Sequence, residues 1–391
     1  MRFAHRVDAL GGGSVTAWEI HTEARAAKKR GENVIVLSVG DPDFSTPQAI
    51  TDRAIAALKA GDTHYTEING KTDLRAAIAA RHAKRNGQDV TARHVLIVAG
   101  AQNGLFVACQ CLFNPGDEVV VPEPAYLTYE ATIGATGAHM VRAAALKDGS
   151  FRPDFSAIEQ AITPKTRGLL LANPGNPTGI VLTHAELETL ATLARRHDLW
   201  VICDEVYAEL VFDGAFHSIS GLPNMAERTV TIGSLSKSHA MTGWRLGWMI
   251  GPEALITHAD NLALCSLYGL PGFIQEAAIE AVSSADHIAP LMRDIYRARC
   301  GVLCEPLKTS NRLKILEPAS GMFALIDIRA TGMSGYDFAW GLYRQEGVSV
   351  LDAAAFGPAA EGYVRVAFTV SDDELAEAAT RILRYVNSLP Q

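Results

Sequence analysis

A lysine in an apolar stretch is the residue of this chain that most suggests chemistry. Residues 234–248 read SLSKSHAMTGWRLGW, in which serines and small residues surround Lys237 and Arg245 follows eight positions later. A lone lysine is usually exposed, but a solvated segment would rarely carry two tryptophans and so few charges. A desolvated lysine can lose its proton and act as a base or as a nucleophile. We therefore interpret Lys237 as a candidate catalytic residue.

Further polar residues stand at the ends of other apolar runs. HVLIVAG leads into AQNGLF, LLLANP leads into GNPTG, and LWVICDEVY ends in an acid and a tyrosine. With the lysine segment, these runs contribute Gly100, Ala101, Gln102, Asn176, Asp204, Tyr207, Ser234 and Ser236. Each has an ordinary explanation alone, because asparagine favours turns and aspartate often caps helices. Open α/β sheets bind ligands at the carboxyl ends of their strands, so we expect these residues to converge.

Together these residue types suit pyridoxal 5'-phosphate. This cofactor needs a lysine for its Schiff base, a carboxylate that keeps its pyridine nitrogen protonated, and a cradle for its phosphate. Lys237 and Asp204 supply the first two, and the predicted helix start at Gly100 would present free N–H groups to an anion. Free lysine has a pKa of about 10.4, so a buried site flanked by cations such as Arg245 must lower it.

The elements that position these residues alternate regularly. From residue 34 to about 250, short apolar runs alternate with segments of helical period, as in βαβ units around a mostly parallel sheet. Several runs, such as VIVLSV and EVVVPEP, are apolar throughout, which indicates strands covered on both faces. THAE at 183–186 and SDDE at 371–374 fit capping boxes, and Thr46 before Pro47 fits an N-cap followed by proline.

The C-terminal part has another pattern: a long helical segment after about residue 285, a few strands and a last helix. A length of 391 residues is most simply read as two domains, with a single large α/β domain as the alternative. We predict an α/β fold with an arm and helix at 1–40 that pack on the small domain, a large cofactor-binding domain at 41–284 whose mostly parallel sheet is flanked by helices, and a small α+β domain at 285–391.

Composition narrows the class of protein. Hydrophobic residues at 48% and charged residues at 20% are globular values, and a net charge of −8 argues against nucleic-acid binding. The six cysteines lack CxxC pairs and close histidines, so we expect reduced thiols and no metal. Without a signal peptide or a membrane-length apolar stretch, we expect a soluble cytoplasmic protein with no membrane partner.

A partial nucleotide-binding motif must be weighed against this interpretation. INGKT at 68–72 ends like a phosphate-binding loop, and VICDEVY resembles a strand that ends in a metal-binding aspartate. However, Tyr65 stands where the first glycine should fall, and the preceding AGDTH is not a buried strand. We therefore do not expect an NTPase.

The joint pattern resembles class I aminotransferases of the fold-type-I pyridoxal-phosphate enzymes. NPGNPTG, DEVY and SLSKSHAMTGWRLGW carry the likeness, and VLSVGDPDFSTP, HYTEINGKTDLR, VPEPAYLTY and GYVRVAFT follow in the family's order across nearly the whole chain. The resemblance implies a homodimer that passes an amino group from an L-amino acid to a 2-oxo acid, such as pyruvate, by a ping-pong mechanism. It also leaves open aspartate or aromatic donors, and a β-eliminating lyase on the same fold. A non-catalytic regulator on this fold would carry a DNA-binding domain, which we do not expect before the first helix.

The resemblance also implies a role for each site residue. Lys237 would form the Schiff base and carry the proton, while Asp204 would bind the pyridine nitrogen. The remaining cofactor contacts would be Asn176 and Tyr207 to the phenolic oxygen, Tyr126 stacked on the ring, and Ala101, Gln102, Ser234 and Arg245 at the phosphate, with Tyr65 reaching that phosphate from a second subunit. Arg365 and the backbone of Gly40 would hold the substrate α-carboxylate, and Tyr268 is another candidate for crossing the subunit interface.

The side-chain pocket is predicted from one short segment. In related enzymes the residues before the first domain helix line this pocket, and here they include adjacent Trp18 and Glu19. A carboxylate in the pocket would favour a cationic donor such as arginine and oppose aspartate or glutamate. The alternative is that Glu19 faces water on an amphipathic helix.

Overall fold

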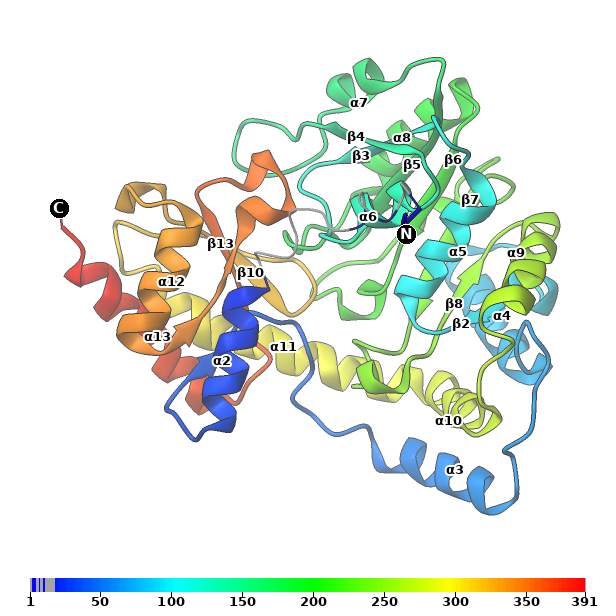
Figure 1. Cartoon of the computed structure of the whole chain (residues 1–391), viewed down its shortest axis with the longest axis horizontal. Helices are drawn as coiled ribbons and strands as arrows, with labels where there is room; N and C mark the ends of the chain where they lie inside the picture. The colour runs from blue at the N-terminus through cyan, green and yellow to red at the C-terminus, as the bar shows by residue number, and fades with distance from the viewer. Residues whose placement is uncertain (1, 5–6, 8–9, 11–17, 391) are drawn as a thin grey trace.

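The computed structural model describes residues 2–4, 7, 10 and 18–390, and within them a seven-stranded sheet holds the centre of the larger part (Figure 1). Its strands lie in the order β2 (Val95–Val98), β8 (Gly247–Ile250), β7 (Thr229–Ser234), β6 (Trp200–Asp204), β5 (Thr166–Ala172), β3 (Glu118–Pro122) and β4 (His139–Ala143). Neighbouring strands are parallel except at β8, which runs antiparallel to β2 and β7. The predicted mostly parallel sheet is confirmed.

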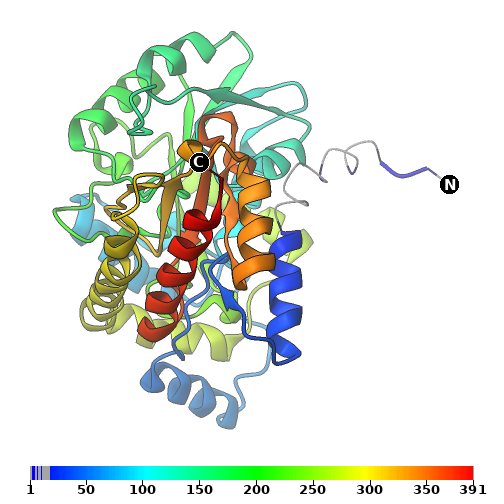
Figure 2. The same ribbon diagram turned by 90° about the vertical axis from the view of Figure 1, so that its left-hand side faces the viewer.

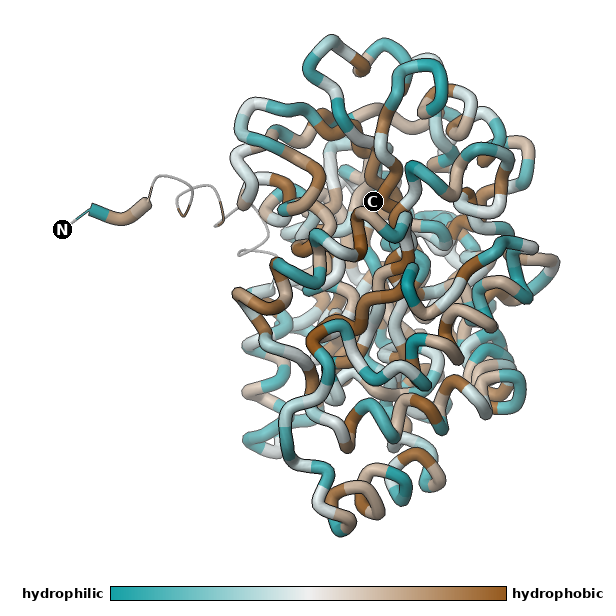
Figure 3. Tube along the Cα trace, turned by 90° about the vertical axis from the view of Figure 1, so that its right-hand side faces the viewer, coloured by the Kyte–Doolittle hydropathy of each residue, from teal (hydrophilic) through white to brown (hydrophobic). Residues whose placement is uncertain are grey.

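Successive residues of the inner strands are buried on opposite faces of this sheet. On β3, Val119 and Val121 pack in a core with α5 (Ala101–Leu112) and α9 (Glu253–Ser266), whereas Val120 packs in a core with α8 (His184–Arg196). Helices cover both faces, so these strands are continuously apolar in sequence, as predicted. In Figure 3, several hydrophobic segments run through the middle of the molecule, and many of the outer loops are hydrophilic.

Two predicted helix starts are confirmed and one is wrong. Thr183 and Ser371 each form a reciprocal capping box, at the starts of α8 and α13 (Asp372–Ser388). Thr46, by contrast, does not cap α3 (Gln48–Lys59), because the N-cap position is Pro47. The Thr46 hydroxyl instead donates to the Ala240 carbonyl at 2.7 Å and accepts the Trp244 indole N–H at 2.9 Å. It thus braces the loop that follows Lys237.

The C-terminal part contains a four-stranded antiparallel sheet, in the order β12 (Leu351–Asp352), β13 (Tyr363–Ala367), β10 (Phe323–Asp327) and β9 (Lys314–Leu316). The helices α11 (Ala285–Leu307), α12 (Gly335–Glu346) and α13 accompany it. The chain's first described helix, α2 (Glu19–Lys29), lies beside α12 (Figures 1 and 2). Next to it, β1 (Ile35–Val36) pairs in parallel with β11 (Val348–Ser349).

The N-terminal helix therefore packs on C-terminal elements. The domain division at 40/41 and 284/285 stays a prediction, and its second boundary coincides with the end of α10 (Gly272–Ser283) and the start of α11. The other α-helices of the described residues are α4 (Thr72–Asn86), α6 (Tyr129–Gly134) and α7 (Phe155–Ala161), with short 3₁₀ turns such as η5 (Thr242–Trp244). None of the described helices is long and apolar enough to span a membrane.

Candidate active site

The carboxyl ends of β5, β6 and β7 open into one cleft, whose empty volume is about 940 Å³ with its opening to solvent included. Such a volume suits a small-molecule site. Most of the predicted site residues line it, namely Trp18, Gly40, Ala101, Gln102, Tyr126, Asn176, Asp204, Tyr207, Ser234, Ser236, Lys237, Arg245 and Arg365. The expected convergence at the strand ends therefore occurs.

Lys237 lies at the centre of these residues. Its ammonium Nζ donates to the Gly40 carbonyl at 2.8 Å. Burial lowers the pKa of Lys237 to about 8; Arg365 and Arg245 act in the same direction, while Asp41 and Asp204 oppose the shift. A useful fraction of this amine is therefore neutral near physiological pH, as a proton acceptor must be.

Asp204 ends β6 with its carboxylate buried. Its Oδ2 accepts the Tyr129 hydroxyl at 3.0 Å, and its Oδ1 accepts the Val206 N–H at 3.3 Å. Burial raises the pKa of Asp204 to about 6, against the lowering effect of these two hydrogen bonds and of Lys237. The anion is still the main form at neutral pH. Tyr129 was not among the predicted site residues, although YLTY places it one helical turn after Tyr126.

An anion cradle forms where α5 begins. Gly100, the N-cap of α5, has φ +80°, and a Cβ there would lie 2.3 Å from Arg245 Nη2. Gly100 is absent from the cleft lining, but it allows Arg245 to lie against the helix start. The guanidinium is held by the Thr242 carbonyl at 2.6 Å, and the Ser234 hydroxyl is 2.8 Å from the Ser236 hydroxyl. A helix N-terminus, an arginine and two serines suit a phosphate.

Arg365 carries a buried positive charge on β13. It donates from Nη1 to Asn176 Oδ1 and from Nη2 to the Ser38 carbonyl, both at 3.1 Å. Among the described residues its Nε has no hydrogen-bond partner, and neither of the two groups that accept from its other nitrogens is a carboxylate. Burial also lowers its pKa. An unpaired buried guanidinium is costly, and a substrate carboxylate would compensate it.

Tyr207 and Tyr126 complete the walls of the cleft. The Tyr207 ring packs edge to face on Phe323 with a centroid separation of 5.3 Å, and Tyr126 packs likewise on Tyr129 at 5.7 Å. Burial raises the pKa of both phenols, so both are neutral donors at physiological pH. No group of three or more His, Cys, Asp or Glu suited to a metal ion occurs in the described part of the chain.

Residues 32–382 match the family described as aminotransferase class I and II. The chain belongs to this aminotransferase family. It is 48% identical to arginine–pyruvate transaminase AruH of Pseudomonas aeruginosa, over 98% of this chain and 97% of that protein. It is 34% identical to an aspartate aminotransferase of Pyrococcus horikoshii, over 92% and 91%. The structure of aspartate aminotransferase from Thermus thermophilus with maleate superposes with a TM-score of 0.93 at 31% identity, covering 98% and 100%.

Class I aminotransferases of this fold depend on pyridoxal phosphate and act on amino acids and 2-oxo acids. The aminotransferase cleft fits that cofactor by the chemistry of its donors: an anion cradle at α5, a buried carboxylate on β6, and between them a lysine whose pKa is lowered. The sequence-based fold and family predictions are thus confirmed.

Besides Gly100, two predicted residues lie outside the cleft of this aminotransferase. Glu19 is exposed on the first turn of α2 and is absent from the cleft lining, which favours the alternative that it faces water. Tyr65 is 86% exposed and packs edge to face on Tyr268 at 5.0 Å. Within the described part of its own subunit, Tyr65 is not among the residues that line the cleft with the anion cradle.

Proposed function

We propose that this aminotransferase takes the amino group of arginine, or of another basic or neutral L-amino acid, and passes it to a 2-oxo acid such as pyruvate. The observation that carries the donor assignment is the 48% identity to an arginine–pyruvate transaminase over nearly both whole chains. The cleft's charges support it. The cations among the described lining residues are Lys237, Arg245 and Arg365, and each already has a role. A second substrate carboxylate, as in aspartate, would find no free cation there.

The site residues divide the work as follows in this proposal. Bound pyridoxal phosphate would supply a carbonyl that takes the amino group and a ring that withdraws electrons from Cα. Lys237 would hold the cofactor and, once released, move the proton from Cα. Asp204 would keep a proton on the ring nitrogen, with Tyr129 holding the carboxylate in place. Arg365 would bind the α-carboxylate. Asn176, which is hydrogen-bonded to Arg365, would orient both the guanidinium and the substrate carboxylate.

The Gly100 turn, Ala101, Gln102, Ser234, Ser236 and Arg245 would hold the phosphate. The Gln102 side chain is already bonded to Thr128 and Thr132, so this residue would contribute its backbone N–H. Tyr207 would donate to the ring oxygen as a neutral phenol, and Tyr126 would stack on the ring. Trp18 would border the substrate side chain.

The enzyme would act as a homodimer in which Tyr65 reaches the partner's phosphate. Tyr65 and Tyr268 are exposed at 86% and 51%, and Leu264 and Leu267 nearby are also exposed. A patch of large apolar side chains rimmed by polar ones is typical of a subunit interface. Tyr268 also has φ +62°, an uncommon conformation for tyrosine that often marks a functional position.

The donor is tested by giving purified holoenzyme each of the standard amino acids other than alanine with pyruvate and measuring the alanine formed. We expect arginine to react at least about tenfold faster than aspartate, because the cleft offers no second cation. Lys237→Ala, the control, should form no alanine. A faster reaction with aspartate or an aromatic amino acid would contradict the donor assignment. Ammonia and pyruvate from a β-substituted amino acid, without an oxo acid, would instead indicate a lyase.

A further inference from the structure

The segment that carries Tyr65 has no helix or strand of its own. It connects α3 to α4 and spans residues 61–71. The Tyr65 side chain is exposed and its described ring neighbour is Tyr268, so the backbone must fix where its hydroxyl points. For a contact across a subunit interface, loose positioning would cost affinity, because the segment would have to be ordered on binding.

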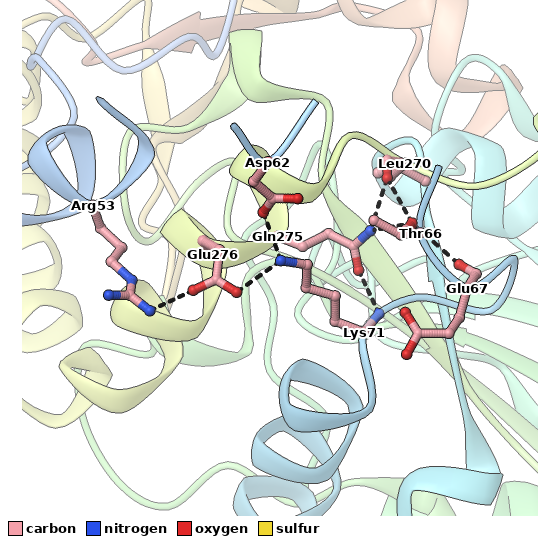
Figure 4. Close-up of polar contacts among 8 residues, drawn as sticks. All are labelled: Arg53, Asp62, Thr66, Glu67, Lys71, Leu270, Gln275 and Glu276. Carbon is pink, nitrogen blue, oxygen red and sulfur yellow. Dashed lines mark hydrogen bonds and ion pairs between the residues drawn. The ribbon is translucent and has the colours of Figure 1, made fainter. Parts of the chain in front are cut away.

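A buried glutamine on α10 holds the middle of this segment (Figure 4). Gln275 is fully buried; its Oε1 accepts the Lys71 N–H at 2.7 Å, and its Nε2 donates to the Thr66 hydroxyl at 3.1 Å and to the Leu270 carbonyl at 2.9 Å. The Thr66 hydroxyl donates to the same carbonyl at 2.9 Å. The Gln275 side chain thus links Thr66, the residue after Tyr65, to the segment that precedes α10 and contains Tyr268.

Lys71 closes the segment from its other end. Its ammonium bridges Asp62 Oδ2 at 2.6 Å and Glu276 Oε1 at 2.8 Å, and Arg53 pairs with the other oxygen of Glu276 (Figure 4). Burial alone would lower the pKa of Lys71, but its two carboxylate partners outweigh burial and raise it, so the ammonium stays charged. A Cβ on Gly272 would lie 2.0 Å from Asp62 Oδ1, so only glycine there lets Asp62 approach the start of α10.

This cluster explains the INGKT motif, whose lysine bonds to two carboxylates of its own subunit rather than facing an open phosphate site. We propose that Lys71 is a positioning residue for the cofactor site of the partner subunit: by joining Asp62 to Glu276 it closes the 61–71 segment and fixes the direction of Tyr65. The inference rests on the proposed contact of Tyr65 with the partner's phosphate. Preorganised contacts bind more tightly because less freedom is lost when they form.

The test compares the affinity of full-length enzyme for pyridoxal phosphate, from equilibrium dialysis of holoenzyme, among five variants and the wild type. Tyr65→Phe should weaken binding about tenfold, since it removes one hydrogen bond to a charged group. Lys71→Met should weaken it about fivefold through misplaced tyrosine. In the double variant, Lys71→Met should add less than about twofold, because it acts through a hydroxyl that is already gone.

Lys308→Met is the matched control. Lys308 also bridges two carboxylates, Glu305 and Glu317, and neither it nor they line the cleft. We expect it to change the unfolding temperature about as much as Lys71→Met and to leave cofactor affinity unchanged. Lys71→Arg, which can keep both ion pairs, should restore most of the affinity.

These measurements distinguish a failure of the positioning role of Lys71 from a failure of the proposed Tyr65 contact. If Tyr65→Phe leaves cofactor affinity unchanged, the contact between subunits is wrong. If Tyr65→Phe weakens binding but Lys71→Met does not, or if the two losses multiply fully in the double variant, the positioning role of Lys71 is wrong while the contact stands.

Discussion

At the scale of single residues, the proposed Schiff-base role of Lys237 implies that its proton should control how fast the enzyme takes up pyridoxal phosphate. Burial, with help from Arg365 and Arg245, lowers the pKa of this amine from 10.5 to about 8. A neutral amine attacks an aldehyde and an ammonium does not. The rate at which cofactor-free enzyme binds pyridoxal phosphate should therefore rise with pH, reach half its maximum near 8 and level off above, as measured by stopped-flow absorbance.

The effect of nearby charges on the pKa of Lys237 can be checked by changing one neighbouring residue. Asp41 raises the pKa of Lys237, because a nearby negative charge stabilises the ammonium. Asp41→Asn should therefore move the midpoint of the rate profile to lower pH. A wild-type midpoint near 10.5, the ordinary value, would show that Lys237 does not experience the burial and charges described above.

At the scale of elements, the start of α5 depends on a glycine. Gly100→Ala would force an unfavourable backbone conformation at φ +80° and place a methyl group 2.3 Å from Arg245 Nη2. We expect a loss of about 1–3 kcal/mol in unfolding free energy from the backbone alone, and at least about a tenfold weaker affinity for pyridoxal phosphate as the cradle opens. Denaturant unfolding and cofactor dialysis measure the two effects.

Gly31→Ala is the matched control for the stability that is lost through the backbone conformation alone. Gly31 has φ +83° after α2, but a Cβ there would meet nothing within 4 Å. It should lose stability without losing cofactor affinity. Equal losses of affinity in both variants would mean that general destabilisation, rather than the displaced Arg245, weakens the site.

Sequence patterns predicted where the strands lie better than they predicted in which direction each strand runs. Continuous apolar runs identified the strands, because helices cover both faces of the sheet, but hydropathy holds no sign of strand direction and β8 runs antiparallel. The strand-end residues converged because topology alone brings them together. Tyr129 was missed because its role depends on how one short helix, α6, is rotated. The sequence left both positions of Glu19 open, in the pocket or facing water, because the side that α2 turns to the cleft depends on tertiary packing.

At the scale of the whole molecule, the proposed contact of Tyr65 with the partner's site predicts complementation between two defective subunits. In a homodimer with shared sites, Lys237→Ala subunits lack the lysine at every site, and Tyr65→Ala subunits lack the tyrosine at every site. In a mixed dimer, the subunit with native Lys237 faces a partner with native Tyr65, so one site is complete while the other lacks both residues. Equal mixing after denaturation and refolding should give a mixed dimer in about half of the molecules and therefore native sites at about a quarter of the wild-type level.

Alanine formation, at a cofactor concentration that leaves the Tyr65→Ala homodimer largely empty, measures those sites. If Tyr65 served its own subunit, no mixture could restore a complete site, and the activity would stay at the average of the two parents.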